Sequence, residues 1–355
     1  MKNRIYNILL VALAGFIVLY YSQKPEYNWD MIAYMGIVTE YSEPDMQKMH
    51  DEVYTSLQNE TPAEIYNGLT ADIEDRRDCL LAAAAFYDEL EYFRVKPLYT
   101  GFVYALHKTG IPLVKATLIP SLIASFLLLI VLYALLSLYV QNPFALILTV
   151  ILGLYEPFRE ITALSSPDAM SNLFIMLSLY LVAKQYKGIW LPVVLFFSVV
   201  SRVDNFIFAG VVSYFVYLQG KRNVLLLSGV IGAIGLAGVI LIPVLMGDTP
   251  DWFMKFAYVA SIGDYVQHWR DVFFLFRHSV YDMLVIAISI FLLIKTHGLA
   301  KKMTLIVLIS VAVHMLLFPS LQERFLVAYE FTLVTMLAWY VIAKYRILPA
   351  QKLAV

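Results

Sequence analysis

Asp30 is the first of several charged residues whose type and setting fit acid–base chemistry. It lies in the aromatic segment 27–34, shortly after the apolar run 5–21. An ionised carboxylate held beside aromatic rings could accept a proton from a reacting hydroxyl group. The alternative is a helix-capping Asp within an aromatic belt.

A second cluster combines two glutamates, an arginine and an aspartate between two apolar runs. Glu156, Arg159 and Glu160 come first, and Asp168 follows in Ser165-Ser166-Pro167-Asp168. Ser, Pro and Asp before an apolar helix are also typical of helix capping. Capping does not account for the other three residues, which could hold sugar hydroxyls or position a base.

Two arginine–carboxylate groups follow. Arg202 and Asp204 lie between two apolar segments with almost no loop, so mutual pairing of snorkelling side chains is the structural alternative. Glu323 and Arg324 precede the last apolar run. An arginine there could bind a phosphate in bidentate fashion and stabilise it as a leaving group, or it could serve as an interfacial anchor.

The fifth group is His268 and Arg270, in the aromatic and charged segment 247–279. Such loops often carry function, although a solvated surface is the alternative. No HExxH-like pattern occurs, so the sequence predicts no zinc site. No cofactor is predicted, and a divalent cation held by carboxylates stays open.

Composition indicates the environment that must position these groups. Of 355 residues, 61% are hydrophobic and 15% are charged, and the mean hydropathy is +0.72. These values are typical of an all-α polytopic membrane protein. A net charge of −1 without a basic tract argues against nucleic acid as a partner. The single cysteine, Cys79, excludes an internal disulfide and a Cys-based metal site.

Apolar runs long enough to cross a bilayer predict about ten transmembrane helices, within a range of about nine to twelve. The first is taken as a retained helix, since no small-residue cleavage pattern follows it. The predicted spans are residues 5–21, 116–140, 143–157, 168–184, 188–201, 203–219, 223–246, 280–296, 302–319 and 324–344.

Basic residues set the orientation, because short cytoplasmic loops carry an excess of Lys and Arg. With both termini cytoplasmic, all 27 Asp and Glu residues fall in outer loops or at outer helix ends. The predicted inner loops and tail then hold Lys184, Lys187, Lys221, Arg222, Lys295, Lys301, Lys302, Lys344, Arg346 and Lys352.

The predicted organisation has three parts. Residues 1–21 form the first transmembrane helix, residues 22–115 an external subdomain, and residues 116–355 a helical bundle with the external loop 247–279. The external subdomain holds 16 of the 27 carboxylates. We expect a surface or capping helix over Cys79–Phe93, and a re-entrant or interfacial helix over Pro97–His107.

Five short segments, in this order along the chain, resemble those of the GT-C superfamily of membrane glycosyltransferases. They are Asp30, Arg94-Val95-Lys96-Pro97-Leu98-Tyr99, Ser166-Pro167-Asp168-Ala169, Ser201-Arg202-Val203-Asp204 and Glu323-Arg324-Phe325. The first outer loop departs from the common pattern, since it has one Asp where many relatives have an acidic pair, and Glu26 lies four residues earlier. Arg94, Lys96 and Tyr99 match the segment that opens the juxtamembrane part in that superfamily.

The resemblance implies transfer of a sugar from a polyprenyl-phosphate donor to an extracytoplasmic glycan, lipid or protein acceptor. Asp30 would deprotonate the acceptor hydroxyl as it attacks the anomeric carbon, with inversion. Arg324, with Arg202 or Arg270, would neutralise the departing phosphate. Contacts to sugar or acceptor are then expected from Glu156, Arg159, Glu160, Asp168, Asp204, His268 and Glu323.

Other classes of membrane protein stay open. A polysaccharide polymerase or ligase would also join lipid-linked glycans on the outer face, and a transporter or flippase would place ionisable groups near the midplane, where His314 is the clearest example. A membrane scaffold is a further alternative. Expected partners are the lipid-linked donor, its acceptor and membrane lipid, in a bacterial inner membrane with the site on the periplasmic or extracellular face.

Overall fold

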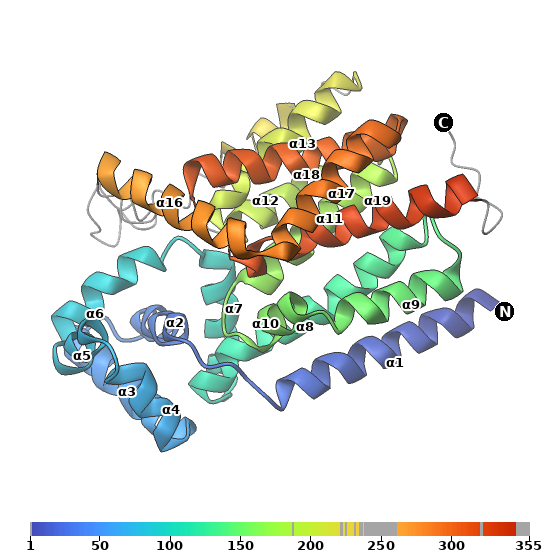
Figure 1. Cartoon of the computed structure of the whole chain (residues 1–355). Coiled ribbons are helices and arrows are strands. Elements are labelled where there is room, and N and C mark those ends of the chain that lie inside the picture. The colour runs from blue at the N-terminus through green and yellow to red at the C-terminus, as the bar shows by residue number, and fades with distance from the viewer. Residues whose placement is uncertain are drawn as a thin grey trace.

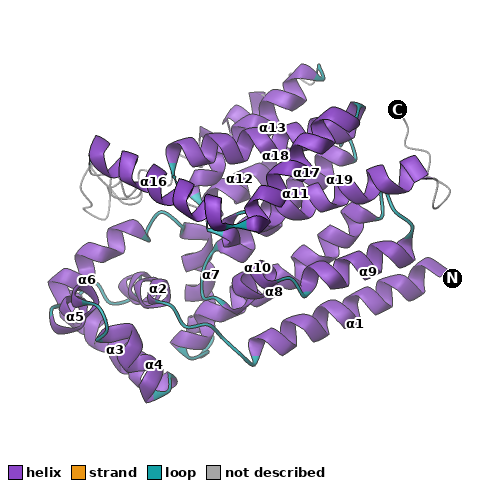
Figure 2. Ribbon diagram, viewed as in Figure 1, coloured by secondary structure: helices purple, strands orange, loops and turns teal. Residues whose placement is uncertain are grey.

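The computed structural model of the chain is helical throughout the residues that it describes, apart from connecting loops and one isolated backbone bridge between Glu26 and Leu164 (Figures 1 and 2). The description covers residues 2–186, 188–220, 223, 226–230, 232–233, 237, 261–319 and 322–345. The predicted span 223–246 and the first half of the external loop 247–279 therefore lie mostly outside the described residues.

One group of short helices occupies one end of the molecule. In chain order these are α2 (Trp29–Glu40), α3 (Met46–Glu60), α4 (Ala63–Thr70), α5 (Glu74–Leu81), α6 (Ala83–Glu89), η1 (Leu90–Tyr92) and α7 (Pro97–Lys108). We call α2–α7 the end subdomain. It confirms the prediction that the segment 22–115 is helical.

The remaining helices form an elongated bundle. They are α1 (Lys2–Ser22), α8 (Leu113–Leu136), α9 (Asn142–Gly153), α10 (Glu156–Ala163), α11 (Asp168–Ala183), α12 (Trp190–Ser201), η2 (Val203–Asn205), α13 (Phe206–Leu218), α16 (Ile262–His278), α17 (Val280–Lys295), α18 (Gly298–Leu317), η3 (Glu323–Phe325) and α19 (Val327–Tyr345). Figure 1 shows the start of α1 and the end of α19 at the end of the bundle opposite α2–α6.

The described helices include fewer long spans than the sequence predicts. Four are long and apolar enough to cross a membrane, α1, α8, α18 and α19, and the pair α16–α17 would add a fifth if it is one span bent by 88°. These helices are compatible with an integral membrane protein. The predicted count of about ten is not confirmed.

Length explains the difference. Helices α9, α11, α12 and α13 coincide with predicted spans but contain only 12, 16, 12 and 13 residues. At 1.5 Å per residue they rise about 18–24 Å, less than the hydrocarbon core of about 30 Å. Hydropathy located these segments, but it did not determine where each helix ends.

Two predictions for the end subdomain had different outcomes. The helix expected over Pro97–His107 is present as α7, which begins with Pro97 at a position where a missing N–H costs nothing. The single helix expected over Cys79–Phe93 is wrong. Ala82 adopts an extended conformation, with φ −134° and ψ 114°, and separates α5 from α6.

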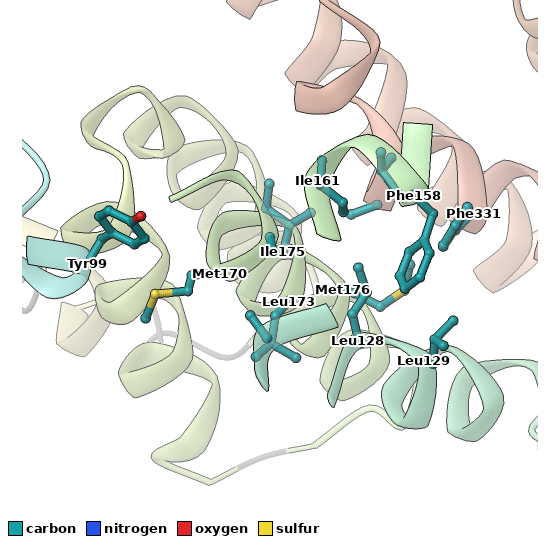
Figure 3. Packing of buried hydrophobic residues seen from close by; sticks show 14 of the residues in the cluster. Tyr99, Leu128, Leu129, Phe158, Ile161, Met170, Leu173, Ile175, Met176 and Phe331 are labelled. Carbon is teal, nitrogen blue, oxygen red and sulfur yellow. The ribbon is translucent and has the colours of Figure 1, made fainter. Parts of the chain in front are cut away.

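A continuous apolar core joins the bundle helices. Figure 3 shows Phe158 of α10 beside Phe331 of α19, with Met176 of α11 and Leu128 of α8 close by. The rings of Phe158 and Phe331 are stacked, with centroids 6.2 Å apart. Aromatic and aliphatic side chains from four helices thus pack together near the middle of α11.

Two polar contacts attach the end subdomain to the bundle. Both carboxylate oxygens of Glu60 accept hydrogen bonds from the first backbone N–H groups of α8, those of Leu113 and Val114, at 3.0 Å each. The Tyr99 hydroxyl donates to the carbonyl of Thr117 at 2.6 Å. The end subdomain therefore has a fixed position over the start of α8.

Candidate active site

Asp30 lies in the first turn of α2, but it does not cap that helix. The capping residue is Asn28, whose side chain accepts a hydrogen bond from the backbone N–H of Met31 at 3.3 Å. The carboxylate of Asp30 is one-third exposed, at 33%, and faces a cavity. Helix capping therefore does not explain this residue.

Asp168 opens α11 and is almost completely buried. Its carboxylate accepts a hydrogen bond from the Ser166 hydroxyl at 2.9 Å, forms an ion pair with Arg202, and lies 3.5 Å from Nε of Arg324. Pro167 holds the N-cap position of α11 and makes no capping hydrogen bond, but the Ser166 hydroxyl accepts a hydrogen bond from the backbone N–H of Asp168 at 3.4 Å. Ser, Pro and Asp therefore do begin this helix, and capping does not account for the contacts of the Asp168 carboxylate with two arginines.

Each nitrogen of the Arg202 guanidinium pairs with a protein carboxylate. Its Nε and one terminal nitrogen donate to the two carboxylate oxygens of Asp204 at 3.1 and 3.0 Å, and its other terminal nitrogen pairs with Asp168. The guanidinium also stacks over the ring of Phe325, 3.9 Å from the centroid. The predicted mutual pairing of Arg202 and Asp204 is confirmed, and few donors of Arg202 remain for a ligand.

Arg324 is held more loosely. It donates to the side-chain oxygen of Gln322 at 3.0 Å, and its distances to the carboxylates of Asp30 and Asp168 are 3.7 and 3.5 Å. Those two distances exceed the normal hydrogen-bond range, so the pairs are electrostatic contacts without tight geometry. A guanidinium in this state can turn to an incoming anion.

Asn172 fixes the backbone around Arg324. Its amide nitrogen donates to the carbonyl of Arg324 at 2.9 Å, and its side-chain oxygen accepts from the backbone N–H of Ala328 at 2.8 Å. One α11 side chain therefore joins η3 to the start of α19. No sequence pattern indicated this role, since a single Asn in an apolar run has many uses.

These groups form one chain of alternating charge. It runs from Asp30 through Arg324, Asp168 and Arg202 to Asp204, and Nδ1 of His314 lies 3.7 Å from the carboxylate of Asp204. Five separate parts of the sequence contribute. Because buried ions are costly unless paired, this alternation permits several charged groups to share one site.

The chain lines a cavity of about 480 Å³ at the junction between the end subdomain and the bundle. That volume lies within the range of small-molecule sites. The wall is formed by charged and aromatic side chains together, namely Asp30, Tyr34, Tyr92, Phe93, Lys96, Pro167, Asp168, Arg202, Asp204, His268, His314, Phe318, Pro319, Gln322, Arg324 and Phe325. We call this cavity the junction pocket.

Lys96 enters the junction pocket from the segment before α7. Burial, assisted by repulsion from Arg202, lowers the pKa of its ammonium group to about 8, although the carboxylates of Asp30, Asp168 and Asp204 raise it. The ammonium nitrogen lies over the rings of Phe93 and Tyr34, 4.7 and 5.4 Å from their centroids.

The structure therefore places seven predicted site residues around one cavity: Asp30, Lys96, Asp168, Arg202, Asp204, His268 and Arg324. Four others lie outside its wall. Arg159 forms ion pairs with Glu26 and Glu156. Burial raises the pKa values of Glu160 and Glu323, and neither carboxylate lines the junction pocket.

The other three predicted residues do not line the junction pocket. Arg94 forms a bidentate pair with Glu40 at 2.9 and 3.1 Å inside the end subdomain, and Tyr99 is buried in the core. Arg270 lies in a second, open groove on α16 with Trp269 and Phe273. Its expected role in binding the donor phosphate is therefore not supported by its position.

Sequence reasoning missed the aromatic wall and His314 as a pocket residue. Tyr34 and Tyr92 are two of 25 tyrosines, and Phe93 and Phe318 are two of 22 phenylalanines, so no local signal separated them from core residues. His314 could have been distinguished from core residues by sequence, because an ionisable side chain deep in an apolar run is costly without a partner.

None of the protein-family models, curated proteins or solved structures compared with this chain matches it. Among the described residues, no three His, Cys, Asp or Glu side chains converge on a point where they could hold a metal ion. The junction pocket itself is therefore the feature that indicates function.

Proposed function

We propose that this chain is a membrane glycosyltransferase of the GT-C type, which transfers a sugar from a polyprenyl-phosphate donor to a glycan, lipid or protein acceptor. The observation that carries the proposal is the pairing of a partly exposed carboxylate, Asp30, with a loosely held guanidinium, Arg324, 3.7 Å away in one pocket. A base and an anion-binding group side by side are the two functions that this reaction needs.

In the proposed reaction, the carboxylate of Asp30 takes the proton of an acceptor hydroxyl. The hydroxyl oxygen forms a bond to the anomeric carbon while the bond from that carbon to the phosphate oxygen breaks, so the anomeric centre inverts. The electron pair of the broken bond leaves with the phosphate. Arg324 stabilises the phosphate because it is not committed to short hydrogen bonds with carboxylates.

Arg202 has a different role in this proposal from the one first expected. Its bidentate pair with Asp204 and its pair with Asp168 make it a positioning residue, which holds Asp168 beside Arg324. Asp168 in turn orients the guanidinium of Arg324. Phosphate binding is assigned to Arg324.

The location of the pocket also fits a lipid-linked donor. The walls come from the end subdomain and from the termini of bundle helices, so the polar head can sit in the pocket while a lipid tail lies against apolar helices. We place both chain termini in the cytoplasm and the pocket on the opposite face, in a bundle of about ten crossings. A bacterial inner membrane is the proposed location.

The test is transfer by the purified chain in lipid from a panel of radiolabelled polyprenyl-phosphate sugars. Asp30→Asn and Arg324→Ala are compared with two controls, Asp51→Asn on α3 and Arg277→Ala on α16, which replace exposed groups outside the junction pocket. Loss of transfer in the first pair only supports the proposal. Transfer that survives Asp30→Asn contradicts the assigned base.

A polymerase or ligase acting on lipid-linked glycans is the second candidate. Besides Arg324, the same pocket is lined by a second cationic side chain, Lys96, which forms no ion pair with a described carboxylate, and this favours a donor with more than one phosphate. The same panel therefore includes polyprenyl-diphosphate donors. Preference for a diphosphate donor, with assembly of oligomeric product, would select this candidate over transfer of a single sugar.

A further inference from the structure

Lys96 differs from the two arginines of the junction pocket in having no carboxylate partner. Its described contacts are one long hydrogen bond from the ammonium group to the backbone carbonyl of Tyr92, at 3.4 Å, and the ring faces of Phe93 and Tyr34. No carboxylate of the described chain lies within ion-pair distance of it. The ammonium group has three donors, one of them takes part in this hydrogen bond, and the side chain lines the cavity.

Such an arrangement is costly in the absence of a ligand. A partly desolvated ammonium group loses solvation energy, and its contacts with ring faces return only part of that loss. Arg202 in the same pocket is compensated by two carboxylates, and Arg324 is near two. Among the described residues, Lys96 is therefore the one cation of the junction pocket without a carboxylate at ion-pair distance, although the carboxylates of Asp30, Asp168 and Asp204 still act on it through space.

We propose that Lys96 is an oxyanion-binding residue of the junction pocket, which receives a phosphate or carboxylate group of the substrate. The aromatic side chains of Tyr34 and Phe93 hold the ammonium group in place and exclude water from one side of it. The identification of the oxyanion as the phosphate of a lipid-linked donor rests on the proposed function. Oxyanion binding itself does not.

A bound oxyanion changes the balance of charges around Lys96. The group faces Arg202, which lowers its pKa, and Asp30, Asp168 and Asp204, which raise it, and His268 and His314 line the same cavity. With a pKa of about 8, the ammonium form predominates at pH 7 and is lost as the pH rises above 8. Binding should weaken about tenfold for each further pH unit.

The experiment measures Kd by calorimetry for three probes, farnesyl phosphate, inorganic phosphate and glucuronate, with the full chain in detergent. Lys96→Gln is compared with Lys96→Arg, which keeps the charge. The matched control is Lys108→Gln, because Lys108 lies at the other end of α7, also over a tyrosine ring (Tyr104, 5.3 Å), but is exposed and outside the pocket.

We expect Lys96→Gln to weaken binding of at least one probe by tenfold or more at pH 7, and Lys108→Gln to leave it unchanged. Lys96→Arg should retain binding and extend it above pH 9. Dependence on Lys96 for farnesyl phosphate alone identifies a lipid-linked phosphate, dependence for both phosphates identifies the phosphate group itself, and dependence for glucuronate identifies an acidic sugar.

Equal affinity of wild type and Lys96→Gln for all three probes overturns the inference. So does wild-type binding that stays constant from pH 7 to pH 10, a test that needs no variant to fold. Because these are binding measurements, they give an answer even if no sugar donor is ever turned over. Failure of the proposed function and failure of the oxyanion site are thus distinguishable.

Discussion

Two carboxylate–arginine pairs near the junction differ in every property that matters for function. Glu40 and Arg94, inside the end subdomain, form a bidentate pair at 2.9 and 3.1 Å, with side chains 5% and 2% exposed. Asp30 and Arg324 are 3.7 Å apart, and their side chains are 33% and 18% exposed. The Glu40 carboxylate and the Arg94 guanidinium hydrogen-bond to each other, whereas Asp30 and Arg324 form no short hydrogen bond with each other and retain donors and acceptors for a ligand.

The difference follows from what surrounds each pair. The guanidinium of Arg94 also lies over the ring of Tyr87, 4.7 Å from its centroid, and the segment after it leads directly to Lys96 and α7. Arg324 instead lines the junction pocket, where its guanidinium lies near two carboxylates, those of Asp30 and Asp168. We infer that the Glu40–Arg94 pair maintains the fold, whereas the Asp30–Arg324 pair acts on a substrate.

The largest effect that we expect is a loss of activity on mutation of the Asp30–Arg324 pair, which we call the open pair. Asp30→Asn keeps the shape of the side chain but removes its ability to take a proton, so transfer should fall about 10²–10⁴-fold. Thermal unfolding in detergent should change little, because Asp30 is partly exposed and not a helix cap. A large loss of stability in Asp30→Asn would erase the distinction between the two pairs.

Mutation of the Glu40–Arg94 pair, which we call the closed pair, should instead lower the stability of the fold. Arg94→Ala leaves Glu40 as a buried charge without its partner, which costs about 3–5 kcal/mol. The double variant Glu40→Leu with Arg94→Leu removes both charges and should recover much of that loss. Unfolding measured by circular dichroism checks both values, and an unchanged midpoint in Arg94→Ala would show that the pair is not a stabilising element.

An intermediate effect is expected at Asn172, which connects the open pair to the bundle. Asn172→Ala leaves the carbonyl of Arg324 and the N–H of Ala328 without their partner, at about 1–3 kcal/mol per buried group. Because η3 then loosens, we expect KM for the donor to rise more than kcat falls. The exposed Asn59→Ala on α3 is the control, and an unchanged KM would limit Asn172 to a structural role.

Much of the site could be predicted from the sequence because charged groups in apolar surroundings are conspicuous. Asp30, Asp168, Arg202 and Arg324 come from four separate segments and line one pocket. Their partners could not be predicted, since pairing depends on how helices pack. No pattern in the sequence distinguishes the two arginines. Arg202 donates hydrogen bonds to the carboxylate of Asp204, whereas Arg324 donates to the side-chain oxygen of Gln322 and is more available to a ligand.

Helix phase explains the mistaken placement of Arg270. It lies two residues from His268 on α16, and positions two apart on a helix point in nearly opposite directions. His268 therefore reaches the junction pocket, while Arg270 lies in the outer groove. The sequence predicted this segment as a loop, for which no such phase exists, and so it grouped the two side chains together.

The smallest effect concerns the cost of keeping Lys96 without an ion-pair partner. Its pKa falls from 10.5 in the unfolded chain to about 8 in the fold, so between pH 8 and 10.5 the unfolded state binds more protons and this group's contribution to stability rises with pH. Below pH 8 the buried ammonium group is at its most costly. Lys96→Met should therefore raise the unfolding midpoint by a few degrees at pH 7 in ligand-free protein, and the gain should disappear near pH 10.5.

Lys96→Met should also weaken oxyanion binding. A gain in stability together with a loss of binding distinguishes a functional cation from a structural one. Lys108→Met, on the exposed end of α7, should change neither property. Arg94→Ala should change the unfolding midpoint in the opposite direction. The charge of Arg94 is paired with Glu40, so its removal leaves a buried carboxylate without a partner and destabilises the fold. If Lys96→Met lowers the unfolding midpoint at pH 7 as Arg94→Ala does, Lys96 belongs with the closed pair and the junction pocket loses its one unmatched cation among the described residues.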